Sequence, residues 1–489
     1  MLATAAGILA LAVAAPQGSA DAAALREFDL AFRATRDPAA NQERREAALA
    51  ALAGQDTREA ARSLLDAFVQ LESEAAPLEA ERLGYLENGR RNKQLEVRPG
   101  LDPLRSLQES VRAHLLALRD PVATHFLLEQ ALERRRLPFS LRSALPALAA
   151  HAGPKADDLL ARALRRRHEP GVMCVLLRTA GALGPRGRSA DDLAIGLLSH
   201  EHAVLREQAA EALARTASPA AIAPLVRRLG EESGRTRTRM GRSLEILTRR
   251  PLGTSPSVWQ RWFEEEGAAY AAGDVALGGG EPSESSAVAD QAVYHGIPIE
   301  GESTLFLFDR SLSMQAPLYQ GEDAPEEANP SRFARAKEEL SAVLGRLSPS
   351  RRFGVIAFGG TLDPFSPEVL PATEENVALA REWIGGLTMN LGTRTYDVLD
   401  FAFAVAGGGA LDRYHDSTVD TLFVLTDGLP IRGGKADSVK RIHAAVRRWN
   451  LFGRVVVHVI CLGDKAPTKF AKGLAEQNGG RYVREPRKD

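Results

Sequence analysis

Five oxygen-bearing side chains in the C-terminal half of the chain have the types and spacing of a divalent-cation site. They comprise two carboxylates and three hydroxyls, with no histidine or cysteine: Asp309, Ser311, Ser313, Thr393 and Asp427. Such hard oxygen ligands suit Mg²⁺, Mn²⁺ or Ca²⁺ and are a poor set for zinc. In a Mg²⁺ site several positions usually stay with water, and one can remain open to a partner. We therefore expect Mg²⁺, with Mn²⁺ or Ca²⁺ as alternatives.

The sequence around these residues shows how the fold could bring them together. Asp309 directly follows Leu305–Phe308, and Asp427 follows Leu422–Leu425 after a single threonine. Both apolar runs are typical of strands buried on two faces. Thr393 lies in a loop that opens a predicted helix. Because ligands in open α/β sheets bind outside the carboxyl ends of the strands, we expect three loops to converge at one edge of a sheet.

The C-terminal half alternates strand-like and helix-like segments. The predicted strands are 305–308, 353–358, 422–425, 455–461 and 482–483. The predicted helices are 332–347, 374–387, 396–406, 436–449 and 467–477. Repeated strand–helix units predict a doubly wound, mainly parallel, Rossmann-like sheet.

The same residues carry a family resemblance. Asp309-Arg310-Ser311-Leu312-Ser313, the downstream Thr393 and Thr426-Asp427-Gly428 resemble the Asp-x-Ser-x-Ser, Thr and Thr-Asp-Gly elements of the von Willebrand factor type A (VWA) family. The resemblance extends over residues 293–486 and includes the integrin inserted domain. It implies a metal-ion-dependent adhesion site (MIDAS).

This resemblance also implies roles for the five residues. Ser311 and Ser313 would bind the metal directly, and Thr393 directly or through water. Asp309 and Asp427 would act largely through water. An acidic side chain of a partner protein would fill the remaining position on the metal.

Three residues of these loops bear on how well the sequence fits the family pattern. Leu312 stands where many members have glycine, and Leu391 replaces the first glycine of a common Gly-Gly-Thr run. Thr395 is a second candidate for the threonine role, although the match through Gly392 favours Thr393.

Residues 25–270 are dense in Ala, Leu and Arg, with apolar residues recurring at helical spacing. Ala147-Leu148, Ala182-Leu183 and Ala212-Leu213 each close a helix-like segment that a second one follows. This period of roughly 30 to 35 residues resembles stacked HEAT repeats. An irregular helical bundle would give similar periodicity and remains an alternative. Trp259 and Trp262 share a helix face and predict a helix that caps the array.

Two segments differ in composition from both halves. Residues 271–292 are rich in Gly, Ser and Glu and predict a flexible linker. Residues 1–22 combine an apolar run with small residues and resemble a signal peptide cleaved near Ala20 or Ala22. No basic residue precedes Arg26, so the positive leader region is missing and an Ala-rich helix is the alternative. We expect export to the periplasm, cell surface or medium, without a stable membrane span.

Charge and cysteine content exclude several classes of function. Lys and Arg total 62 against 63 Asp and Glu, so no nucleic-acid partner is expected from composition. Cys174 and Cys461 lie far apart in sequence and predict neither a disulfide framework nor a cysteine-based zinc site. Cys461 lies in an apolar run, which predicts a buried, inert thiol.

These features favour a non-enzymatic scaffold. Its VWA region would bind a partner's acidic residue through the metal, and its helical repeats could bind a second protein. The first alternative is an intracellular VWA cofactor of a AAA+ ATPase assembly, which an uncleaved N-terminus would favour. The second is a metal-dependent hydrolase, with Asp397, expected as a surface carboxylate, or His415 as its base. Assays of metal-dependent hydrolysis would reveal it.

Overall fold

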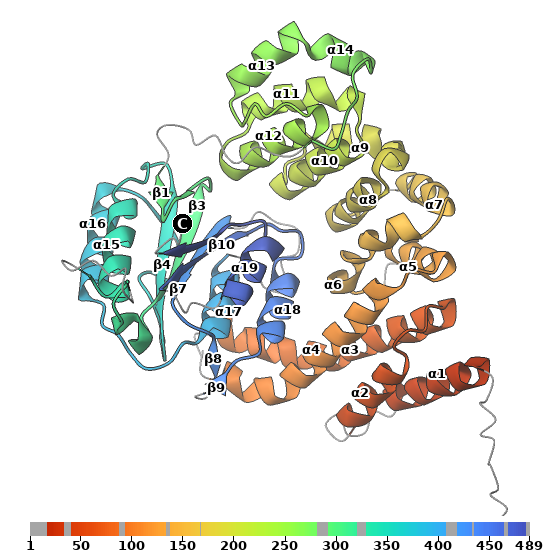
Figure 1. Ribbon diagram of the computed structural model, residues 1–489, viewed down its shortest axis with the longest axis horizontal. Helices are drawn as coiled ribbons and strands as arrows, with labels where there is room; N and C mark the ends of the chain where they lie inside the picture. The colour runs from red at the N-terminus through yellow and green to blue at the C-terminus, as the bar shows by residue number, and fades with distance from the viewer. Residues whose placement is uncertain are drawn as a thin grey trace, which may run out of the picture. The chain divides into compact units, whose positions relative to one another are not determined.

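The computed structural model describes residues 17–33, 41–87, 93–133, 137–166, 168–280, 292–319, 329–406, 418–432, 435–463 and 468–485. The chain forms two compact units, residues 1–156 and 157–489. The first unit is helical in its described part, and the second passes from helices into a mixed sheet flanked by helices (Figure 1). The predicted fold class, a helical region followed by an α/β sheet domain, is confirmed.

The helices of the first unit lie in chain order from the red to the orange part of Figure 1. They are α1 (Gln17–Arg33), α2 (Gln42–Ala51), α3 (Arg58–Glu87), α4 (Gln94–Ala117), α5 (Pro121–Glu133), α6 (Phe139–Arg142) and the 3₁₀ helix η1 (Leu145–His151). The long helices α3 and α4 pack along each other. Arg45 on α2 is buried and donates two hydrogen bonds of 2.8 Å to Glu74 on α3. The unit is therefore held by buried ion pairs as well as by apolar contacts.

A further run of short helices follows, as far as residue 272. They are α7 (Lys155–Leu164), α8 (Pro170–Leu183), the 3₁₀ helix η2 (Gly184–Ala190), α9 (Asp191–Leu197), α10 (Ala203–Arg215), the 3₁₀ helix η3 (Pro219–Ala221), α11 (Ile222–Glu231), α12 (Gly234–Thr248), α13 (Pro256–Glu265) and α14 (Gly267–Ala272). Helix α10 packs against both α8 and α12, so the first helices of successive pairs lie side by side. Such nearest-neighbour stacking is the arrangement expected of helical repeats.

The last helices of this region pack around two tryptophans. Trp259 and Trp262 on α13 are buried, and their rings meet edge to face at 5.3 Å. The Trp259 indole donates to the Gly253 carbonyl at 2.8 Å. Beyond α14, the amide of Gly278 donates to the carbonyl of Leu247 on α12 at 2.7 Å. The start of the predicted linker is thus bound to α12, whereas residues 281–291 lie outside the described residues.

The sheet has five parallel strands and two antiparallel additions at one edge. Its strands are β3 (Ser303–Asp309), β4 (Arg352–Phe358), β5 (Leu362–Pro364), β6 (Leu370–Pro371), β7 (Thr421–Thr426), β10 (Val456–Leu462) and β11 (Tyr482–Glu485). The order is β11-β10-β7-β3-β4-β5, with β6 also paired to β4. Two small hairpins, β1 (Val293–Tyr294) with β2 (Ile297–Pro298) and β8 (Ile431–Arg432) with β9 (Lys435–Ala436), lie outside it. All five predicted strands are present, and the short ones were not predicted.

Helices cover both faces of the sheet, as Figure 1 shows. One layer holds α15 (Arg332–Leu344) and α16 (Glu374–Gly386); the other holds α17 (Thr395–Val405), α18 (Val439–Trp449) and α19 (Thr468–Gln477). Every residue of β3 and β7 is buried, which explains their continuous apolar runs. The chain leaves β3 toward β4 and returns to β7 on its other side, so the strand order reverses at β3. Such a switch point is where ligands bind in open α/β sheets.

The described residues bear only partly on the predictions for export and cysteine chemistry. Residues 1–16, most of the predicted signal peptide, lie outside them. Helix α1 begins at Gln17 and includes both expected cleavage positions. In the described part of the chain, no helix is long and apolar enough to cross a membrane. Both cysteines are buried and free, as predicted for Cys461, and burial raises the pKa of each thiol to about 12.

Candidate metal centre

The first loop of the candidate centre is anchored by Asp309 at the end of β3. Its carboxylate is fully buried and accepts the Ser311 amide at 2.8 Å and the Thr426 hydroxyl at 2.6 Å. The pKa of Asp309 is raised to about 7, because burial, with a smaller contribution from the nearby Asp427, outweighs the opposing hydrogen bonds from Ser311 and Thr426. A cation bound nearby would stabilise the charged form of this buried carboxylate.

Three oxygens of the first and third loops form a compact cluster. The hydroxyl oxygens of Ser311 and Ser313 lie 3.0 Å apart, and the Ser313 hydroxyl donates to Oδ1 of Asp427 at 2.7 Å. Neighbouring ligand oxygens around an octahedral Mg²⁺ are about 3 Å apart, because each lies about 2.1 Å from the ion. The spacing of these oxygens therefore fits a shared Mg²⁺-sized cation.

Thr393 lies in the second loop, beside the third. It is buried, and its carbonyl accepts the Ile431 amide at 3.0 Å. Gly392 before it has φ of +107°, a conformation that favours glycine. Within the described residues, no hydrogen bond joins the Thr393 hydroxyl to the other four candidate side chains. The Thr395 hydroxyl is buried and lacks a partner in the same part of the chain, so both threonines remain candidates.

Backbone hydrogen bonds tie the three loops to one another. The Asn390 amide of the second loop donates to the Arg310 carbonyl of the first at 2.9 Å. The Ile431–Thr393 bond joins the third loop to the second. The Thr426–Asp309 and Ser313–Asp427 bonds join the third to the first. The predicted convergence of the three loops at the carboxyl ends of the strands is thus observed. The side chains of Ser311, Ser313 and Asp427 are hydrogen-bonded to one another, and Asp309 joins them through the Ser311 amide.

A buried arginine that the sequence analysis missed completes the group. Nη1 of Arg332, the first residue of α15, donates to Oδ2 of Asp427 at 2.8 Å, and both side chains are buried. Gly463 leaves room for it, because a Cβ at that position would lie 2.4 Å from the guanidinium carbon. Arg332 holds one oxygen of Asp427 while Ser313 holds the other. No motif marks position 332, since its role depends on contacts with distant segments.

The three loops that carry the candidate centre also carry exposed apolar side chains. Leu312, Leu391, Leu429 and Ile431 are 47%, 79%, 50% and 38% exposed, and they come from the three loops. We call these four residues the apolar rim. Only nine large hydrophobic residues are this exposed in the described part of the chain, so their concentration here is notable. Leu312 and Leu391 are also the two residues that depart from the family pattern.

Other metal and catalytic arrangements find little support in the described residues. No group of three or more His, Cys, Asp or Glu side chains there is arranged to hold a metal ion. Metal binding at the candidate centre would therefore depend on the hydroxyls. Asp397 was expected at the surface; instead it is buried and paired with Arg394 on the first turn of α17. His415, the other candidate base, lies outside the described residues.

Comparison with known proteins identifies relatives of the sheet region. Residues 325–484 match the family model of the von Willebrand factor type A domain, a range that includes Thr393 and Asp427 but begins after Ser313. Human inter-alpha-trypsin inhibitor heavy chain H4 is 26% identical over 186 residues, covering 38% of this chain and 18% of that protein. Rat von Willebrand factor A domain-containing protein 5A is 28% identical over 179 residues, 36% of this chain and 19% of that protein.

These matches cover about a fifth of the curated relatives' length. Among solved structures, a von Willebrand factor type A protein from Catenulispora acidiphila shares 19% identity with a TM-score of 0.31, covering 39% of this chain and 40% of that chain.

Proposed function

The C-terminal part of this chain is a von Willebrand factor type A domain, and we propose that it is a non-enzymatic adhesion module that binds an acidic side chain of a partner protein through a Mg²⁺-type ion. Ser311 and Ser313 would bind the ion directly and Thr393 directly or through water. Asp309 and Asp427 would act largely through water. The ion would supply an electrophilic position for the partner's carboxylate. Mn²⁺ and Ca²⁺ are the alternatives to Mg²⁺.

Support comes above all from the oxygen cluster. At the switch point of the sheet, Ser313 Oγ lies 3.0 Å from Ser311 Oγ and 2.7 Å from Asp427 Oδ1. Arg332 leaves this carboxylate less negative, because its guanidinium contacts Oδ2 of Asp427. An ion held here keeps more of its own charge for an incoming acid.

The apolar rim narrows the chemistry of the partner. A lone carboxylate would leave the exposed Leu312, Leu391, Leu429 and Ile431 in water. A partner that places apolar side chains beside its acidic residue would cover them. Burying one such side chain contributes about 1.5–3 kcal/mol to binding, which is comparable to a charge-assisted hydrogen bond. The proposed ligand is therefore an acidic residue within an otherwise apolar patch.

We also propose roles for the remaining segments. Residues 1–22 would direct export, residues 25–270 would form a HEAT-like array that binds a second protein, and residues 271–292 would link it to the VWA domain, 293–486. The paired helices and the packing of α10 on α8 and α12 support the repeat arrangement. Limited proteolysis should cut first within 271–292, and mass spectrometry of secreted native protein should show a start near residue 21 or 23.

Titration calorimetry of the full chain with Mg²⁺ tests the metal centre. Wild type should give a saturable heat, and a ligand at about 100 times its dissociation constant should stabilise the fold by about 2.7 kcal/mol. Asp309→Ala should abolish both effects without unfolding the domain, since Asp309 is the last residue of β3 and its loss leaves the apolar part of the strand in place. Glu375→Ala removes an exposed carboxylate on α16 and should change neither. Equal heats for wild type and Asp309→Ala, or none for wild type, would contradict the proposal.

A further inference from the structure

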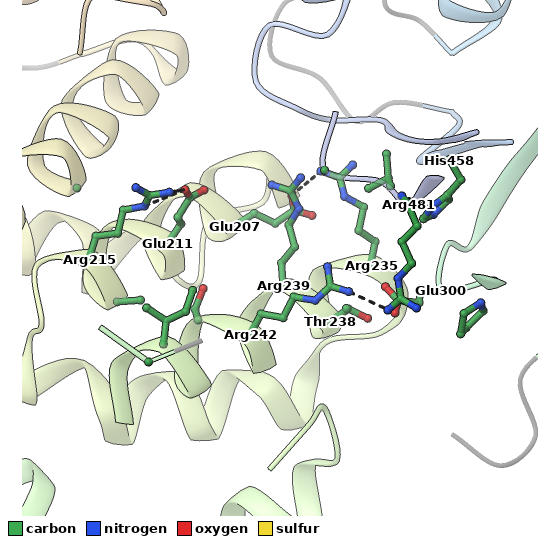
Figure 2. A pocket seen from close by; sticks show the side chains of 18 of the residues that line it. Glu207, Glu211, Arg215, Arg235, Thr238, Arg239, Arg242, Glu300, His458 and Arg481 are labelled. Carbon is green, nitrogen blue, oxygen red and sulfur yellow. Dashed lines mark hydrogen bonds and ion pairs between the residues drawn. The ribbon is translucent and has the colours of Figure 1, made fainter. Parts of the chain in front are cut away.

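A cavity of about 560 Å³ lies between the helical array and the VWA domain within the second unit. Figure 2 shows its walls: side chains of α10 and α12 on one side, and of β10 and the loop before β11 on the other. Its sheet residues Glu300, His458 and Arg481 stand near the amino ends of β3, β10 and β11. The candidate metal centre lies at the carboxyl ends of the strands, so the cavity is distinct from it. Its volume is in the range of small-molecule sites.

The lining of the cavity carries an excess of positive charge. Five arginines face three glutamates: Arg215, Arg235, Arg239, Arg242 and Arg481 against Glu207, Glu211 and Glu300. His458 adds no charge at neutral pH, because burial, followed by the nearby Arg481 and Arg242, lowers its pKa to about 3. An anion of charge about −2 would balance the lining.

Two of the glutamates each pair with one arginine, Glu211 with Arg215 at 2.9 Å and Glu300 with Arg242 at 3.5 Å. The third, Glu207, is shared, because it lies 3.0 Å from Arg235 and 3.5 Å from Arg239. Nε of Arg235 is buried and without a hydrogen-bond partner among the described residues. Arg481 has no carboxylate within ion-pair distance in the same part of the chain. Buried donors and crowded guanidinium groups are destabilising unless an acceptor is present.

The Arg235 guanidinium remains charged in this setting. Burial, then the neighbouring Arg239, lowers its pKa to about 10, still well above neutral pH. Its Nη2 donates to Glu207 and to the Gly453 carbonyl. Arg235 therefore adds a fixed positive charge to the wall of the cavity, which favours an anion there.

We propose that this cavity binds a small phosphate-bearing anion of the phosphate monoester class. Guanidinium groups present planar, paired donors that match phosphate oxygens, and a monoester carries a charge of about −1.5 to −2 at neutral pH. The ligand would contact Arg239 and Arg242 of α12 together with Arg481 of the VWA domain. Because these arginines come from both sides, the bound anion would hold α12 against the edge of the sheet.

Calorimetric titration of the full chain with glycerol 3-phosphate tests this site. EDTA in the buffer keeps the metal centre out of the measurement, so the result is independent of the proposed adhesion function. Wild type should bind with a saturable heat, and the ligand should raise the melting temperature. Arg481→Gln and Arg239→Gln should each weaken binding at least tenfold. Arg346→Gln, which changes an exposed arginine elsewhere in the VWA domain, should have no effect.

Three results would overturn the assignment. They are the absence of saturable binding to wild type, unchanged affinity in Arg481→Gln, and tighter binding of succinate than of glycerol 3-phosphate. Arg481→Gln is the more informative variant, since the Arg481 guanidinium pairs with no described carboxylate and its loss should leave the fold intact. A melting temperature equal to that of wild type without ligand verifies that point.

Discussion

The helical region and the VWA domain place their buried charges differently. In the helical region, arginines that are buried or mostly buried pair with acids on, or directly after, other helices: Arg45 with Glu74, Arg105 with Glu72 and Arg206 with Glu232, at separations of 29, 33 and 26 residues. In the VWA domain, Asp309, Asp427 and Arg332 gather at one edge of the sheet. The first pattern holds neighbouring helices together, whereas the second leaves two carboxylates beside one guanidinium and favours a cation.

The largest effect is expected from breaking a helical ion pair. Arg45→Met should lower the free energy of unfolding by about 3 kcal/mol, because it leaves the carboxylate of Glu74 without its buried partner. Arg44→Met breaks the neighbouring pair with Glu27, in which both side chains are about half exposed, and should cost far less, because solvent screens the pair. Urea unfolding followed by circular dichroism measures both. Similar losses in the two variants would contradict a structural role for the buried pair.

A second prediction distinguishes the two kinds of buried arginine. Arg332→Met should destabilise the metal-free protein by about 3 kcal/mol, since Asp427 loses the cation that contacts its Oδ2. Saturating Mg²⁺ should recover much of this loss by supplying another positive charge. The loss in Arg45→Met should not respond to Mg²⁺. Thermal unfolding with Mg²⁺ and with EDTA compares the two variants. If Mg²⁺ leaves the stability loss of Arg332→Met unchanged, Arg332 does not act together with the proposed metal centre.

Local patterns predicted the sheet region and placed the candidate site residues relative to its strands. Asp309 and Asp427 each follow a continuous apolar run, so the sequence predicted that both lie at the end of a strand. Arg332 was not, because its contact with Asp427 spans 95 residues and needs the space above Gly463. The burial of Asp397 was also missed, because its i,i+3 spacing from Arg394 indicates the pair but not whether the carboxylate is buried or exposed.

The same limit applies to the helical region. Its periodicity predicted helices and an approximate repeat length, but not which arginines turn inward. Arg45 is buried while the adjacent Arg44 is exposed, and only the position of Glu74 on another helix explains the difference. Side chains that are long and charged are normally at the surface, so their burial follows from tertiary pairing and not from composition.

A smaller effect is expected at the last strand of the VWA domain. Burial raises the pKa of Glu485, but hydrogen bonding and attraction to His295 and Arg335 outweigh it and leave the pKa below its usual value. A lowered carboxyl pKa gives stability that is present above the unfolded-state pKa, about 4.3, and is lost as the pH falls. Glu485→Gln should therefore cost about 1–2 kcal/mol at pH 7 and progressively less between pH 5 and 3.

Glu338 provides a matched control for Glu485, because both glutamates contact Arg335. Glu338 contacts Arg335 at 3.4 Å with a side chain that is 72% exposed, so Glu338→Gln should change stability by less than about 0.5 kcal/mol. Urea unfolding across this pH range measures both variants. A loss in Glu485→Gln that is constant with pH would show that the pair contributes packing and not charge.

The smallest effect concerns the two threonines of the second loop. Thr395→Val removes a buried hydroxyl that has no partner among the described residues, so the metal-free protein should gain about 0.5–1 kcal/mol. Thr393→Val should leave metal-free stability almost unchanged and weaken Mg²⁺ binding about tenfold, equivalent to about 1.4 kcal/mol. Chemical unfolding in EDTA and calorimetry with Mg²⁺ give the two quantities. If Thr395→Val were the variant that lost Mg²⁺ affinity, the unpartnered hydroxyl would itself be the ligand, and the assignment of Thr393 from the Gly392 match would be wrong.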